Sequence, residues 1–151
     1  MNYTVETIAD ALAAHLAPVL PGVSFYKNLN QQEMKKPCIF LQQQYGSIKP
    51  ETGGYFLRTI GLDLICMEDE KQEDLQERYQ KTAETLDLHL KTFPYTDGIQ
   101  SEPVRLRPEK REWKMEEDGL HYRFELRERV TIPKTEVKMQ TIETYQEGVV
   151  E

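Results

Sequence analysis

The sequence predicts an α+β domain in the order α-β-β-β-α-β-β, with a largely antiparallel sheet and two helices on one of its faces. Two segments repeat apolar residues at helical spacing, and several others alternate apolar and polar residues. The predicted strands mostly follow one another through short turn-rich connections, which favours hairpins. The length of 151 residues suits one domain. We expect it to cover residues 1–133, followed by a C-terminal extension over residues 134–151.

The first helix is predicted over residues 4–20. Thr4 or Asn2 is a plausible N-cap, and the Pro-Gly pair at 21–22 ends the helix. Its apolar positions lie close to a 3.6-residue period: Val5, Ile8, Leu12, Leu16 and Val19. A short strand is expected over residues 23–28, followed by a polar loop.

Two longer strands come next. Pro37 opens a strand over residues 38–45, since proline is tolerated at the first residue of a strand. Residues 46–54 read GSIKPETGG and predict a turn-rich connection, so the strand over residues 55–67 should return antiparallel. Both faces of that strand are rich in apolar residues, which indicates a central position in the sheet.

The second helix is predicted over residues 68–93. One stripe recurs at steps of three and four residues, and it consists of Leu75, Tyr79, Ala83, Leu86, Leu90 and Phe93. Acidic residues crowd the expected first turns, where they would suit the positive end of the helix dipole. Pro94 ends the pattern.

A long hairpin follows, with arms over residues 104–115 and 120–132. Its tip is Glu117-Asp118-Gly119, and Asp-Gly is a strong signal for a tight turn. The second arm alternates regularly, which predicts a half-buried strand whose outer face includes His121 and Arg123. Basic and acidic residues alternate along the hairpin, so cross-strand ion pairs are favoured over a nucleic-acid-binding stripe.

Composition excludes several classes of protein. The net charge is −7, which argues against a general nucleic-acid binder. Residues 68–99 contain nine acidic and four basic side chains, so the acidity is centred on the second helix. No apolar stretch could span a bilayer, and the first twenty residues do not resemble a secretory signal. Cys38 and Cys66 lie in apolar runs and are expected to be buried free thiols.

No catalytic, metal-binding or cofactor-binding motif is present, so we predict no enzymatic activity, no metal and no cofactor. His15, His89 and His121 each stand alone in the sequence, and a structural or solvent-facing role is favoured for each. Asp63 interrupts an apolar strand. A buried carboxylate there would need a partner or a raised pKa; alternatively its face is partly open, or it pairs with Arg58 or another base.

Three surfaces are better suited to protein partners than to substrates. They are the connection over residues 46–54, the acidic hairpin tip and the chain after Pro133. Exposed strand edges and long hairpins are natural places for subunits to join their sheets. The candidate interface residues are Lys49, Glu51, Tyr55, Arg58, Glu116, Glu117, Asp118, Val137 and Met139.

The sequence resembles the tail terminator (tail-completion) proteins of phages, most closely the type found in prophages of Gram-positive bacteria. The resemblance covers about residues 4–132 and rests on element order and a few anchor positions. After the opening helix these anchors are Phe25-Tyr26-Lys27, Gln31-Gln32, Pro37 leading Cys38-Ile39-Phe40-Leu41, Tyr55-Phe56-Leu57-Arg58, an acidic helix, and Asp118-Gly119-Leu120-His121-Tyr122-Arg123-Phe124.

The resemblance implies a structural protein of the virion tail, assembled in the cytoplasm of a host bacterium. Such proteins form a ring, commonly a hexamer, that caps the tail tube, stops its polymerisation and offers the docking surface for the head. The implied partners are other copies of the chain, the tail tube protein and the head–tail connector, with DNA passing through the ring. The alternatives are a head–tail connector, a tail tube component, or a small cytosolic binding module. Residues 134–151, longer than the fold requires, would either reach a neighbouring subunit or be disordered.

Overall fold

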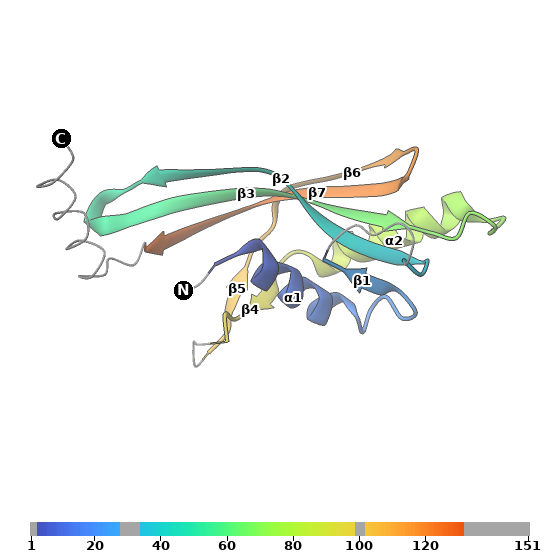
Figure 1. Ribbon diagram of the computed structural model, residues 1–151, viewed down its shortest axis with the longest axis horizontal. Helices are drawn as coiled ribbons and strands as arrows, with labels where there is room; N and C mark the ends of the chain where they lie inside the picture. The colour runs from blue at the N-terminus through green and yellow to red at the C-terminus, as the bar shows by residue number, and fades with distance from the viewer. Residues whose placement is uncertain (1–2, 28–33, 99–101, 132–151) are drawn as a thin grey trace, which may run out of the picture.

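A computed structural model describes residues 3–27, 34–98 and 102–131 of the chain. It confirms the α+β class: a sheet of five strands in the order β1-β2-β3-β7-β6 carries α1 and α2 on one face, and β4 and β5 form a small separate sheet. In Figure 1 both helices lie on the same side of the long strands. The predicted C-terminal extension over residues 134–151, which includes Val137 and Met139, lies outside the residues that the structure describes.

The helix α1 (Val5–Leu16) begins as the sequence predicts. Thr4 is its N-cap, and a capping box joins it to Thr7: the Thr7 amide donates to Thr4 Oγ1 at 3.2 Å, and the Thr4 amide donates to Thr7 Oγ1 at 3.1 Å. Such a cap stabilises a helix by about 1 kcal/mol. The helix ends four residues earlier than predicted, and residues 17–20 form turns before Gly22. The buried residues Ile8, Leu12 and Leu16 face the sheet.

The strands β1 (Ser24–Tyr26) and β2 (Cys38–Pro50) form the one parallel pair in the five-stranded sheet, and β2 pairs antiparallel with β3 (Tyr55–Met67). The bounds of β3 match the prediction, and it lies between β2 and β7 at the centre of the sheet. The predicted end of β2 is wrong. Residues 46–50 have the composition of a turn, yet they continue the ladder, as Gly46 opposite Ile60 illustrates. The turn is confined to residues 51–54, where η1 (Thr52–Gly54) lies.

The helix α2 (Leu75–His89) is shorter than predicted, because residues 68–74 form turns ahead of it. Asp69 closes one such turn by accepting from the Lys71 amide at 3.0 Å. Most of the acidic run therefore precedes the helix. Asp74 is the N-cap and Glu77 lies in the first turn, so the predicted match with the helix dipole holds at the N-cap and not for the acidic residues before it. After the helix, β4 (Phe93–Tyr95) replaces its predicted last residues and pairs with β5 (Val104–Leu106).

The predicted hairpin consists of β6 (Glu109–Glu116) and β7 (Gly119–Thr131), with its tip where the sequence placed it. The first arm differs from the prediction, since residues 104–106 pair with β4 instead. Gly119 has a φ of 143° and lies against β3: a Cβ there would clash with the Cys66 carbonyl oxygen. Both cysteines are buried free thiols, as predicted. One core joins the two helices to the helix-facing residues of β2, β3 and β7.

Candidate functional site

A long extension of the sheet reaches beyond the helices in Figure 1. We call it the arm and define it as residues 45–61 and 125–131. Its base is the row Tyr45–Gly61–Glu125, and near its end Pro50 pairs with Phe56, which pairs with Val130. All of residues 45–50 are exposed, including Tyr45 at 51% and Ile48 at 52%. The arm therefore presents strand backbone and apolar side chains to solvent.

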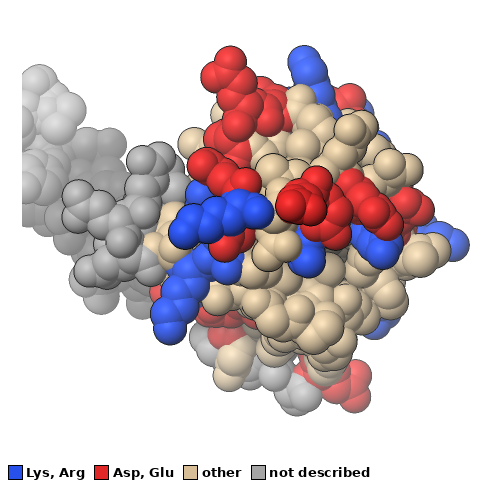
Figure 2. All heavy atoms as spheres, turned by 90° about the vertical axis from the view of Figure 1, so that its right-hand side faces the viewer, with Lys and Arg blue, Asp and Glu red and all other residues tan. Residues whose placement is uncertain are grey.

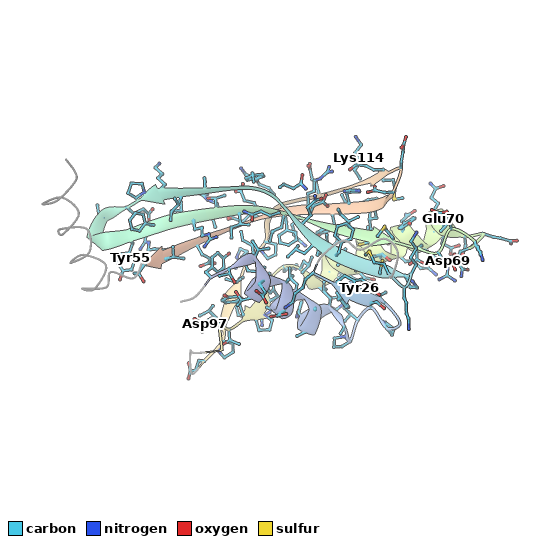
Figure 3. The ribbon with its side chains drawn as sticks, in the orientation of Figure 1. Tyr26, Tyr55, Asp69, Glu70, Asp97 and Lys114 are labelled. Atoms are coloured by element: carbon cyan, nitrogen blue, oxygen red, sulfur yellow. The ribbon has the colours of Figure 1, made fainter. Side chains whose placement is uncertain are left out.

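Four predicted interface residues lie on the arm: Lys49, Glu51, Tyr55 and Arg58. Figure 3 shows Tyr55 at its far end. Arg129 Nε contacts Glu51 Oε1 at 3.0 Å, and its guanidinium lies 5.7 Å from the centre of the Tyr55 ring. Arg58 differs from the others because it is turned inward.

Arg58 lies on the helix side of the sheet, where its Nη1 donates to the Tyr3 carbonyl at 2.7 Å and its guanidinium lies 5.9 Å from the Tyr3 ring centre. The pKa of the Tyr3 hydroxyl is raised, mainly by burial. Arg58 thus holds the start of the chain against the sheet. Of the four residues, Lys49 is exposed, and Glu51 and Tyr55 keep exposed surface for a partner.

The other predicted residues, Glu116, Glu117 and Asp118, lie at the opposite end of the sheet. There the hairpin tip is next to the end of β3 and the turns that precede α2. We call this region the acidic end and define it as residues 68–78 and 114–118, which contain nine acidic and three basic side chains. Figure 3 shows Asp69, Glu70 and Lys114 at this end, and Figure 2 shows acidic side chains gathered on it. The structure thus separates the predicted interface residues into two sites.

A buried cluster supports the hairpin tip on the face of the sheet away from the helices. Asp63 is 1% exposed, and its Oδ2 accepts from His121 Nδ1 at 2.7 Å and from Arg123 Nε at 3.3 Å. Asp118 Oδ1 accepts from His121 Nε2 at 2.6 Å, and Arg123 Nη2 donates to Glu116 at 2.6 Å. Asp63 is therefore partnered, by His121 and Arg123 and not by Arg58.

His121 is clamped between two carboxylates, which is a structural role of the kind that the sequence favours, although the histidine that stands alone in the sequence has partners in the fold. Asp63 is 58 positions away in the chain, which explains why no local pattern revealed the pair. A neutral imidazole has one N–H, whereas both ring nitrogens here face an acceptor, so the geometry favours the imidazolium. Burial acts to lower the pKa of His121, but the hydrogen bonds to Asp63 and Asp118 outweigh it and the pKa is raised. The cluster ties the tip to the sheet.

A second contact on this face lies at the base of the arm. Tyr45 extends across β3 at Gly61, and its hydroxyl donates to Glu125 Oε2 on β7 at 2.6 Å, which raises the pKa of the Tyr45 hydroxyl. Any Cβ at position 61 would overlap the Tyr45 ring. Lys110 Nζ lies 3.7 Å from the other oxygen of Glu125. Hence one aromatic side chain joins three strands where the arm begins.

The described residues offer contact surfaces at both ends of the long strands. Among residues 3–27, 34–98 and 102–131, no group of three or more His, Cys, Asp or Glu is placed to hold a metal ion. Within the same ranges, neither helix is long and apolar enough to cross a membrane. The hollow next to His121, of about 350 Å³, is lined by mixed side chains that include Phe40, Ile65 and Asp118.

Comparison with known families connects these features to a function. A family model described as "Phage tail terminator protein" matches residues 7–138, which is most of the chain and includes the arm, the hairpin tip, all of α2 and most of α1. No curated protein sequence matches the chain. The family is a structural one, and it places the chain among the proteins of the phage virion that build the tail. On this match over most of its length, the chain belongs to the phage tail terminator protein family.

Proposed function

We propose that the chain caps the end of the phage tail tube as a closed ring of identical subunits, stops the tube from growing, and provides the docking surface for the head–tail connector. The observation that carries this proposal is the arm: three strands extend past the helices with exposed residues 45–50, which is a surface for other subunits and not for a small substrate. A heterologous contact between copies closes into a ring when the rotation from one copy to the next is a whole-number fraction of a full turn. A hexamer is the ring size that the family resemblance implies.

The separation of the two sites supports two partners. A capping ring must bind copies of itself and also meet the tube on one side and the connector on the other. The arm and the acidic end lie at opposite ends of the long strands, so contacts at one need not block the other. We infer that the acidic end meets the tube or the connector, while the arm joins subunits.

The acidic end also bears on the DNA that would pass through the ring. Nine carboxylates against three basic side chains would repel the phosphate backbone, which keeps DNA from sticking in the channel. We expect the purified protein to show no measurable affinity for double-stranded DNA at low salt in a fluorescence anisotropy titration. Tight binding under these conditions would rule out this role for the acidic end.

The proposed function is tested by electron microscopy of phage particles made without this protein. We expect tails of excessive and variable length and heads without tails, both restored by supplying the wild-type chain. Tails of normal length joined to heads would refute the proposal. Sedimentation of the purified protein separates the alternatives within the tail, because open tubes would indicate a tube component, whereas a monomer or a closed ring agrees with a terminator.

A further inference from the structure

The arm has two open strand edges of the same length. The strand β2 pairs with β3 along residues 45–50 and has no strand on its other side among the residues that the structure describes. The strand β7 pairs with β3 along residues 126–131, and its partnership with β6 begins at Glu125 and runs towards the hairpin tip. Each edge thus presents six residues whose outward backbone groups have no strand partner within the described ranges.

The β2 edge has little of the protection that isolated proteins give to such edges. Monomers usually block them with charges, prolines or bulges. Here Lys49 is the single charged residue in the stretch 42–49, and Pro50 stands at its far end. A bulge lies between Gln43 and Tyr45, at the base of the arm, so residues 45–50 continue in regular register with β3. An edge of this kind is suited to accept another strand.

Strand direction decides which edge of a second copy can pair with the β2 edge in a ring. Both β2 and β7 run antiparallel to β3, so they are parallel to each other. Rotation about an axis roughly along the strands preserves their direction, and it brings the β2 edge of one copy to the β7 edge of the next. A two-fold contact would instead pair β2 with β2.

We propose that the β2 edge of the arm pairs in parallel with the β7 edge of the arm in a neighbouring copy, with Ser47 beside Arg127, so that the arms of adjacent subunits form one continuous sheet. This inference rests on the proposed ring. The side chains agree with it, because Ile48 lies on the same face as Arg58 and Glu128, and therefore as Leu126 and Val130. In the pair, the exposed Ile48 lies beside the row of Leu126, Glu128 and Val130 in the next copy, and part of its apolar surface is removed from water.

Cysteine cross-linking tests the pairing directly. Ser47 and Arg127 lie on one face in the same row across β3, both are exposed, and neither belongs to the Asp63–His121 cluster. Ser47→Cys and Arg127→Cys chains would be made separately, mixed and treated with a short thiol cross-linker. Arg129→Cys serves as a second β7 position in case the register is shifted by two residues. The native cysteines are buried, and the unaltered chain is the control.

We expect dimers to cross-link in the mixture and not in either variant alone. A chain that carries both substitutions should give a ladder that stops at the ring number. Cross-linking of Ser47→Cys alone would overturn the proposal in favour of a two-fold contact. So would closed rings that resist cross-linking at both β7 positions, or a chain that remains monomeric up to millimolar concentration.

A substitution at the edge supplies an independent measurement. Ile48→Lys adds a charge to the open edge and should weaken self-association by about tenfold or more in sedimentation experiments. The matched control is Leu88→Lys, which places the same charge on an apolar residue that is 73% exposed on α2. Equal association of the two variants would overturn the edge pairing. If Ile48→Lys still forms rings and normal tails, the edge pairing is wrong while the proposed function stands. If deletion of the protein leaves tail length unchanged, the proposed function itself is wrong.

Discussion

The strands β2, β3 and β7 pass through two very different surroundings. In their packed half, which we define as residues 38–41, 62–66 and 120–124, every side chain except that of Arg123 is buried, and the helices cover one face. In the arm the same strands keep their pairing, yet residues 45–50 are all exposed. Pairing along β3 is therefore independent of cover by the helices. The packed half can supply the stability of the fold, and the arm is free to serve contacts.

The largest effect is expected in the packed half. Leu86 of α2 is fully buried, and Leu86→Ala should lower the free energy of unfolding by about 3 kcal/mol through lost contacts and a residual cavity. Leu88→Ala in the same helix is the control, because Leu88 is 73% exposed. Urea unfolding followed by circular dichroism measures both. Similar losses for the two variants would contradict the assignment of the buried face of α2.

A smaller loss is expected at the buried cluster. His121→Ala removes the group that faces both Asp63 and Asp118 and should cost about 2 kcal/mol near pH 6, since it takes a hydrogen-bonded partner from a buried carboxylate. His89 is partly buried and lies outside the cluster, so His89→Ala offers a control.

The pH dependence of that loss has a definite sign. The pKa of His121 is raised in the folded chain, so its contribution to stability is present below its unfolded pKa of about 6.5 and disappears as pH rises through the higher folded value. The difference between wild type and His121→Ala in urea unfolding should therefore shrink between pH 6 and pH 9. A difference that stays constant or grows with pH would show that His121 is not held as the imidazolium.

The smallest effect is expected at the boundary between the two halves. Tyr45→Phe removes the hydroxyl that donates to Glu125 while keeping the ring over Gly61, and it should cost about 1 kcal/mol. Tyr55→Phe near the end of the arm should change the free energy of unfolding by less than about 0.5 kcal/mol. Urea unfolding measures the free energy of unfolding of both variants. Equal losses would contradict the view that the base of the arm contributes more to stability than its end.

Much of the fold could be predicted because it follows local patterns. The Thr4 cap, the bounds of β3 and the hairpin tip at Asp118 each depend on a few neighbouring residues. The continuation of β2 through Gly46 could not be seen, because its ladder is made with residues of β3 and overrides the turn composition. The start of α2 was placed too early because the acidic run before it resembles a helical first turn.

The interface residues stay a prediction, and their arrangement in the fold was out of reach of the sequence. Tyr55 and Glu117 lie at opposite ends of the long strands, a fact that depends on the antiparallel register of β3 and β7. The pairing of His121 with Asp63 depends on the same register, which sets Asp63 opposite Arg123 and Ile65 opposite His121. The inward orientation of Arg58 follows from its contact with Tyr3, which no pattern around position 58 indicates.

The contact between Tyr45 and Gly61 also bears on how relatives of this chain can diverge. A side chain at position 61 would occupy the space of the Tyr45 ring, so we expect the two positions to vary together. A relative that replaces Gly61 by a larger residue should carry a small residue at position 45, and it then loses the tyrosine hydroxyl that holds Glu125. We expect position 125 to change with them, since its buried carboxylate would lose one of its two partners, Tyr45 and Lys110. We thus expect three positions in three different strands to change together.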